Sequence, residues 1–291
     1  MRHPLLALLV LAPLAASGEP RQCLGRGSAQ WLVDETFLVV ANPEGFENQL
    51  RANVCLPLYD TPGLLLDYAQ LEAGFFNYVS PVYLHQGAYL SLTPLSFLQF
   101  RGDLAGVVLW PLPLDGAGYF GFPGYTDDFR DSTMPARGAR AAVGLNATLS
   151  VNLQAEVPLT SRVSLLATDS FAGDYWYVGD RPYWFNPRRD LVLRQSDWLI
   201  KNTGFLLAGV KLSETVELHL GAVDDLSWVP RSGYLANILS AFVSVPIRRH
   251  RALRDIEPYL RLGAYTAHGW RTGATLMAGV SVAWALPLKA Q

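Results

Sequence analysis

The sequence predicts an all-β fold: a transmembrane, antiparallel, up-and-down β-barrel of about twelve strands. The first observation behind this is a stretch of strict alternation between apolar and polar residues over 143–157, which is typical of a strand with one apolar and one polar face. The second is its length, because strands in soluble sheets run for about 5–6 residues, whereas a tilted membrane-spanning strand needs roughly 9–11. The third is composition, with 50% hydrophobic and only 16% charged residues.

The N-terminus has the features of a secretory signal peptide. A short basic start precedes an apolar segment, 5–16, and a small-residue cleavage site, 16–18. The apolar segment is too short to cross a bilayer as a helix. We therefore expect residues 1–18 to be removed and residues 19–291 to form a single barrel domain.

Charge and cysteine content exclude several classes of function. The formal net charge is −2 and the basic residues form no clustered face, which argues against a nucleic-acid partner. The two cysteines, Cys23 and Cys55, are compatible with one disulfide in an exported chain, or with two unpaired thiols. Neither the cysteines nor the five histidines have the spacing of metal ligands, so we expect no metal and no cofactor.

Twelve segments alternate in the same way, each bounded by turn residues or by a loop. In the second, for example, Gln49, Arg51 and Asn53 alternate with Leu50, Ala52 and Val54. An even number of strands brings both ends of the chain to the same side of the membrane; ten strands behind an N-terminal periplasmic segment are the alternative. The expected strands are 31–40, 49–58, 64–75, 82–92, 97–110, 143–157, 162–176, 198–211, 215–223, 234–245, 259–267 and 275–286.

The connections between these segments alternate between shorter and longer. This is typical of bacterial outer-membrane barrels, which have turns in the periplasm and loops outside. The periplasmic turns are expected at 60–63, 93–94, 158–161, 212–214 and 246–257, and the outer loops at 42–46, 77–81, 111–137, 177–196, 225–233 and 268–273.

The polar faces of the strands carry charges of both signs, which we expect to face the lumen. A barrel of about twelve strands is far narrower than a general porin of 16–18 strands. Long charged side chains could therefore pair across the lumen and largely fill it, or they could line a narrow selective channel. The expected lumen-facing residues are Arg51, Glu72, Arg101, Asp103, Glu156, Arg162, Lys211, Glu217 and Arg261.

On these features the chain resembles the outer-membrane β-barrel class. Its C-terminal strand, 274–286 with Trp284, is similar to the strand that such proteins present to the barrel-assembly machinery, although the chain continues to Gln291 and does not stop on an aromatic residue. The resemblance implies the outer membrane as location, with its lipid and lipopolysaccharide as surroundings and the assembly machinery as a partner during insertion.

The function expected from the sequence is non-catalytic: a narrow channel for a small solute, or a structural barrel that binds a surface ligand. The alternative is a barrel-borne hydrolase of lipid or peptide, since some small barrels carry a base beside a nucleophile or activated water. The local motifs of such enzymes are missing. A third interpretation is a soluble β-sandwich. The candidate acid–base residues are His85, His219, His268, Asp127, Asp128, Asp224 and Asp225.

Two outer loops are rich in aromatic residues, and either of two roles would explain them. They could form the aromatic girdle at the membrane interface, or a platform for an extracellular ligand. The adjacent Arg188 and Arg189 could meet anionic lipopolysaccharide or be solvated. The aromatic residues are Tyr119, Phe120, Phe122, Tyr125, Tyr175, Trp176, Tyr177, Tyr183 and Trp184.

Overall fold

A computed structural model describes residues 29–59, 65–66, 68–111, 118–124, 139–248 and 253–287. The expected signal peptide, 1–18, and Cys23 lie outside these residues. The signal peptide and the disulfide between Cys23 and Cys55 therefore stay predictions. In the part of the chain that is described, no helix is long and apolar enough to cross a membrane.

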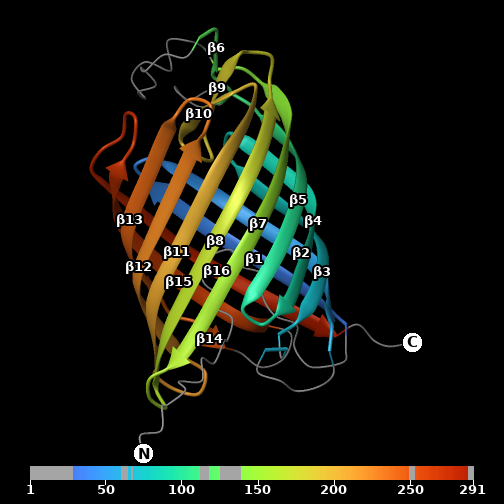
Figure 1. The fold of residues 1–291 in the computed structure, drawn as a ribbon, viewed down its shortest axis with the longest axis vertical. Helices are drawn as coiled ribbons and strands as arrows, with labels where there is room; N and C mark the ends of the chain where they lie inside the picture. Colours follow the sequence, from blue (N-terminus) through green and yellow to red (C-terminus); the bar gives the residue numbers. More distant parts are fainter. Residues whose placement is uncertain are drawn as a thin grey trace, which may run out of the picture.

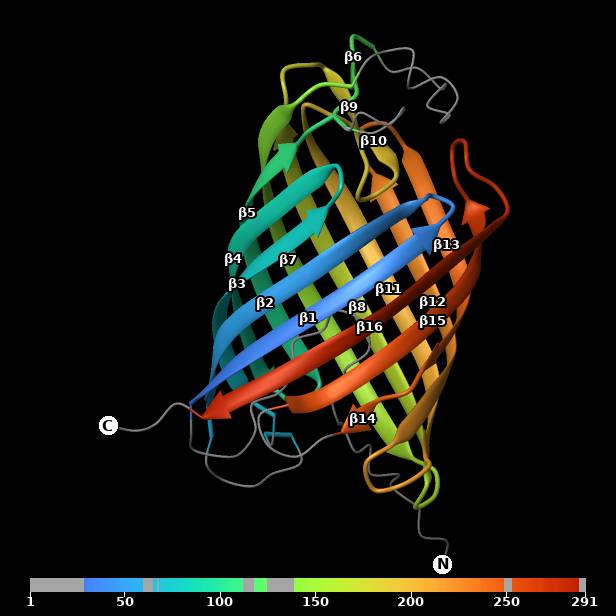
Figure 2. The same cartoon turned by 180° about the vertical axis from the view of Figure 1, so that it is seen from behind.

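Twelve strands form a closed antiparallel barrel, as Figures 1 and 2 show. Each of them pairs with its neighbour along the chain, and β1 pairs with β16 to close the ring. The prediction of twelve strands is confirmed, and the alternative of ten is wrong. The barrel strands are β1 (Gln30–Ala41), β2 (Gly45–Pro57), β3 (Gln70–Ser80), β4 (Tyr83–Leu95), β5 (Leu98–Leu109), β7 (Ala142–Pro158), β8 (Val163–Val178), β11 (Ser196–Lys211), β12 (Glu217–Val229), β13 (Tyr234–Ser244), β15 (Leu253–Ala267) and β16 (Ala274–Pro287).

In the described part of the chain, four short strands stand outside the ring of twelve. β14 (Ile247–Arg248) pairs with the start of β15. The other three, β6 (Gly121–Phe122), β9 (Tyr183–Asn186) and β10 (Leu191–Arg194), form a small separate sheet. That sheet lies at the end of the barrel opposite to the start of β1 and the end of β16 (Figure 2). We call this the outer end, because the topology predicted from the sequence puts the shorter turns, at the opposite end, in the periplasm.

The outer face of the barrel is apolar enough to require hydrocarbon around it. Phe75, Leu104 and Leu149 are each more than half exposed, and similar side chains surround them on every strand. Contiguous apolar surface of this extent is not found on soluble monomers, and a closed barrel leaves no backbone group unpaired in lipid. The chain is therefore an integral outer-membrane barrel, and the β-sandwich interpretation is wrong.

Several strands differ from their predicted bounds near the outer end, and two of these differences change an expected loop. β3 runs to Ser80, so the expected loop 77–81 shrinks to a two-residue turn. β12 runs to Val229, because its pairing with β13 continues to the Val229–Tyr234 pair. Asp224 and Asp225 therefore lie within a strand and point to opposite faces, although an acidic pair is common in solvated loops.

The outer face also carries two acidic side chains, although charged residues were expected to face the lumen. Asp169 on β8 and Asp224 on β12 are exposed there, on either side of Gly204 in the pairing register. Each accepts a hydrogen bond from an asparagine amide of the next strand, Asn202 at 2.6 Å and Asn237 at 3.0 Å. The amides replace part of the hydration that lipid cannot supply.

We expect the double variant Asp169→Leu/Asp224→Leu to be more stable than the wild type in lipid. A basic residue at the midplane of the lipid face costs roughly 2–4 kcal/mol and an acidic one less, so the gain should be about 1 kcal/mol per site. Urea unfolding in lipid vesicles measures it. Asp180→Leu, at an exposed outer-loop position, should leave the midpoint unchanged. A lower midpoint for the double variant would contradict a lipid-facing position.

Candidate functional site

A hairpin from the outer loop between β8 and β11 enters the mouth of the barrel. We call residues 179–195 the plug hairpin: β9, the turn 187–190, and β10. Asp190 at the end of the turn has a φ of 52°, a left-handed conformation that aspartate tolerates better than most residues. Gly179, where the hairpin leaves β8, has a φ of 70°, and a Cβ there would overlap the ring of Tyr119. The hairpin is thus bent sharply at both its base and its tip.

Apolar side chains hold the body of the plug hairpin inside the barrel. Trp184, Leu191 and Leu193 are essentially inaccessible to solvent, and they pack with Trp176 of β8 and Leu199 of β11. The indole N–H of Trp184 donates to the carbonyl of Arg194 at 3.1 Å, so burial leaves this polar group paired. The outer mouth is consequently a packed core and not an open, water-filled vestibule.

At the tip, the guanidinium of Arg188 binds the wall formed by β2, β3 and β4. Its Nε lies 2.8 Å from Oε2 of Glu47, and its Nη2 lies 3.4 Å from Oε1. Its Cζ lies 4.5 Å from the centroid of the Tyr78 ring. Although burial opposes it, the Glu47 carboxylate raises the pKa of Arg188 above its usual range. The pair combines a forked, charge-assisted contact with a cation–π contact.

His85 of β4 is the remaining neighbour of Arg188, and its hydrogen bond to Asn146 determines the tautomer of its ring. The amide of Asn146 donates to the carbonyl of Tyr175 at 3.1 Å, which directs its Oδ1 toward His85. Nε2 of His85 donates to that oxygen at 3.1 Å. Its Nδ1 is then the unprotonated nitrogen, and it accepts from Nη1 of Arg188 at 3.4 Å.

The next residue of the tip, Arg189, faces a different sector of the wall. Its Nη2 lies 3.8 Å from Oδ2 of Asp174 on β8, and the same oxygen is 2.8 Å from Nζ of Lys201 on β11. Burial lowers the pKa of Arg189, and the adjacent Arg188 lowers it further. Asp174 therefore serves two cations, one from the wall and one from the hairpin.

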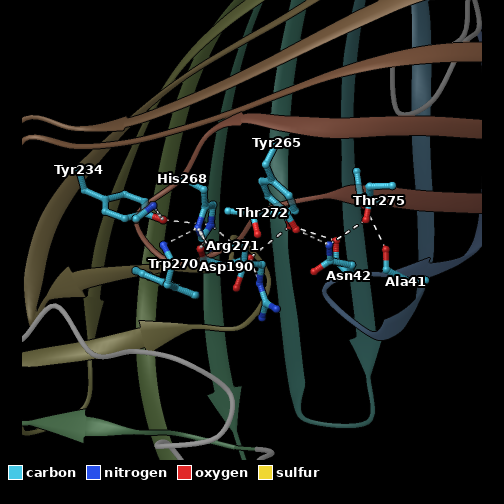
Figure 3. Close-up of polar contacts among 12 residues, drawn as sticks. Ala41, Asn42, Asp190, Tyr234, Tyr265, His268, Trp270, Arg271, Thr272 and Thr275 are labelled. Carbon is cyan, nitrogen blue, oxygen red and sulfur yellow. Dashed lines mark hydrogen bonds and ion pairs between the residues drawn. The ribbon is translucent and has the colours of Figure 1, made fainter.

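The third tip residue, Asp190, binds the outer loop between β15 and β16, as Figure 3 shows. Its carboxylate accepts from Nε of Arg271, and its Oδ2 lies 3.4 Å from the hydroxyl oxygen of Tyr265. Nε2 of His268 lies 3.1 Å from the Asp190 carbonyl oxygen and 3.3 Å from its Oδ2. The same Tyr265 hydroxyl donates to the carbonyl of Asn42 at 3.0 Å, which links the tip to the turn between β1 and β2.

Three consecutive residues of one turn therefore contact three separate sectors of the barrel. Arg188 is held at β2–β4, Arg189 at β8, and Asp190 at the β15–β16 loop. The cavity that remains beside Arg188, between Tyr83 and Trp176, has a volume of about 10 Å³, room for about one water. In this arrangement the tip spans the lumen just inside its outer end.

Most residues expected to face the lumen lie on the inner face, but they pair locally and not across it. Arg101 contacts Asp103 of its own strand at 2.6 Å and lies over the Tyr89 ring at 3.8 Å. Arg51 donates to the Tyr78 hydroxyl at 3.1 Å, and Glu72 is fully buried.

The remaining expected residues lie nearer the periplasmic end or on β15. Arg261 contacts Asp225 and donates to Ser240 at 2.9 Å. Glu217 contacts Arg248 at 3.4 Å. Three others are less enclosed: Glu156 is half-buried on β7, Lys211 is exposed at the end of β11, and Arg162 is exposed in the turn between β7 and β8.

The structure corrects both interpretations of Arg188 and Arg189, and it separates the described aromatic residues by their burial. The arginines neither meet lipopolysaccharide nor are solvated, since they lie inside the barrel. Tyr177 is exposed on the outer face, and Tyr175 contacts Trp198 there; Tyr183 is half-buried. Five others are buried in the mouth and form neither a girdle nor a platform: Tyr119, Phe120, Phe122, Trp176 and Trp184. Tyr125 lies outside the described residues.

The described residues among those considered for a hydrolase do not assemble. His268 contacts Asp190 and not Asp225, which contacts Arg261. Its Nδ1 accepts the backbone N–H of Trp270 at 3.3 Å and of Arg271 at 3.0 Å, so this nitrogen is not available as a base. His219 lies 3.6 Å from Glu217 at the other end of the barrel. Asp127 and Asp128 lie outside the described residues, as does the cysteine expected to pair with the buried Cys55.

Glu47, Asp174 and Lys201 were missed by the sequence analysis, although a signal for them exists. Strand alternation places them on the same faces as residues that were recognised, since Glu47 shares its parity with Arg51 and Lys201 shares its parity with Lys211. The plug hairpin itself has only a weak signal, the apolar run 191–193 inside a loop.

Comparison with known proteins finds only distant structural likeness. No protein-family model and no curated protein sequence matches the chain. Among solved structures, an outer-membrane channel from Pseudomonas putida F1 is 11% identical, with 94% of this chain and 100% of that chain covered and a TM-score of 0.43. A NanC porin is 9% identical, with 87% and 98% covered and a TM-score of 0.40. OmpT, an outer-membrane protein of Vibrio cholerae, is 7% identical, with 88% and 97% covered and a TM-score of 0.36. Likeness this distant assigns no substrate.

Proposed function

We propose that the protein is a gated, non-catalytic passage across the outer membrane, closed by the plug hairpin. The observation that carries the proposal is the three-way attachment of the tip through Arg188, Arg189 and Asp190. These attachments are ion pairs and hydrogen bonds between a loop and a wall, so they can break without unfolding any barrel strand. A permanently closed structural barrel is the competing function.

The inner face below the tip supports a passage. Polar side chains continue toward the periplasmic end, for instance Gln99 and Asn152, whose amides are joined by a 2.7 Å hydrogen bond. The polar sector is one part of this face; another part is apolar and includes Leu207, Phe242 and Tyr259.

The test is the conductance of a barrel without its plug. We expect replacement of residues 180–194 by a short Gly-Ser linker joining β8 to β11 to give discrete, long-lived conductance steps in planar bilayers. The wild type should be mostly closed. Replacement of the turn 230–233 between β12 and β13 by the same linker is the control and should stay closed. If the plug-less barrel folds but gives no steps, the passage is refuted and the structural barrel remains.

The non-catalytic part of the proposal rests on the hydrogen bonds of His268. Both of its ring nitrogens have partners within the rim, and its side chain is buried among Asp190, Tyr234 and Trp270. These contacts suit a residue that positions the loop. We further propose lipopolysaccharide as the neighbour of the outer rim, and the barrel-assembly machinery as the partner that receives the C-terminal strand β16.

A further inference from the structure

We propose that the wall around Arg188 is a binding cage for a guanidinium-bearing solute, and that the barrel's own Arg188 occupies it when the plug hairpin is in place. The cage consists of Glu47, Tyr78, Tyr83 and His85. The inference rests on the proposed function, because a solute reaches the cage only after the hairpin has withdrawn. It adds the class of solute, a small molecule or a peptide side chain that carries a guanidinium group.

The cage contacts both the edges and the face of a planar guanidinium group. The two oxygens of Glu47 receive Nε and Nη2 of Arg188, at 2.8 and 3.4 Å, along one edge of the guanidinium. The unprotonated Nδ1 of His85 receives Nη1 at 3.4 Å from another side. The Tyr78 ring covers the face at 4.5 Å. An ammonium group is a compact point charge; it can lie over the ring face, but it cannot form the forked contact along the edge.

The cage is built from the wall and does not depend on the hairpin for its shape. Tyr83 of β4 donates its hydroxyl to one oxygen of Glu47, and Gln49 of β2 donates its amide to the other. His85 is fixed from behind through Asn146. Groups preorganised in this way lose little freedom when they bind, which favours affinity.

If the hairpin withdrew, Glu47 of the cage would lose its cation, whereas the neighbouring Asp174 would not. Asp174 keeps Lys201 at 2.8 Å when Arg189 leaves. Glu47 has Arg188 as its cation among the described residues. A carboxylate that is buried and then loses its counter-ion is strongly unfavourable, so the emptied cage selects a replacement of the same chemistry.

Chemical rescue of an emptied cage tests this inference. We expect methylguanidinium to raise the thermal unfolding midpoint of Arg188→Ala barrels in detergent by several degrees at millimolar concentration, as a ligand that binds only the folded state does. Methylammonium at the same concentration should have a much smaller effect, and neither cation should shift the wild type. Arg188→Gln provides a second emptied cage of similar side-chain length, should the alanine variant fold poorly.

Matched variants separate the cage from a general effect of cations. Arg189→Ala removes the adjacent arginine but leaves the cage filled, so it should not respond to methylguanidinium. Glu47→Gln/Arg188→Ala removes the carboxylate and should lose the response. An equal response to both cations, or an equal response in Arg189→Ala, would overturn the cage.

This readout is independent of the passage itself. If Arg188→Ala is rescued but the plug-less barrel never conducts, the gated passage falls and the cage stands as an internal binding site. If the plug-less barrel conducts but no variant discriminates between the two cations, only the cage falls. If both hold, arginine should block the current of the plug-less barrel, and Glu47→Gln should relieve that block.

Discussion

We expect the Glu47→Gln variant to release the plug hairpin, with the open-to-closed ratio rising more than about 100-fold. Glu47 and Arg188 are both largely buried, with side-chain exposures of 7% and 15%. Removing one partner of such a pair costs about 3–5 kcal/mol, because the other charge stays buried without compensation. Since every 1.4 kcal/mol is about tenfold, the low end of that range already gives the predicted ratio. Planar-bilayer recordings measure it as open probability.

Limited proteolysis provides a second measurement of the same release. Trypsin added outside the barrel can cleave after Arg188 or Arg189 only when the tip has left the lumen, so Glu47→Gln should be nicked far faster than the wild type. The control is Glu44→Gln in the turn that precedes β2, where the side chain is exposed; it should match the wild type in both measurements. Equal cleavage of Glu47→Gln and wild type would mean that the Arg188 contact does not hold the tip.

The barrel could be predicted from the sequence because lipid on one side and a polar interior on the other impose a period of two on every strand. The alternation is uninterrupted over 143–157, and the observed strand β7 has nearly the same bounds, Ala142–Pro158. Strand ends were less predictable. Whether β12 stops at Val223 or Val229 is decided by its pairing with β13, which the alternation of β12 alone does not contain.

The site was less predictable than the barrel because it is built by a loop that folds inward. Residues 191–193 are apolar without alternation, and they are buried on all sides by contacts with distant strands. Two adjacent arginines in a loop are usually solvated. Arg188 and Arg189 are largely buried because the hairpin lies inside the barrel. Strand alternation could have placed the charged wall residues Glu47, Asp174 and Lys201 on the inner face. Their contacts with the hairpin could not be predicted in this way.

We expect Trp184→Ala to open the hairpin by a different route, with a comparable loss of about 3–5 kcal/mol in the free energy that holds it closed. Trp184 is fully buried in the body of the hairpin, within ring contact of Trp176 at 5.9 Å and Tyr119 at 6.4 Å. Its truncation leaves a cavity in the apolar mouth. Trypsin cleavage and open probability should rise as in Glu47→Gln, whereas Trp228→Ala, at a 43%-exposed position on the outer face, should leave both unchanged.

The double variant Glu47→Gln/Trp184→Ala decides whether the hairpin moves as one body. If the apolar body and the tip leave together, each contact stabilises the same closed state, and the two free energies of opening should add in the double variant. If the tip can leave while the apolar body stays packed, Trp184→Ala will not change cleavage at Arg188, and the double variant will resemble Glu47→Gln. The first outcome makes the apolar core part of the gate; the second confines the gate to the turn 187–190 and its three attachments.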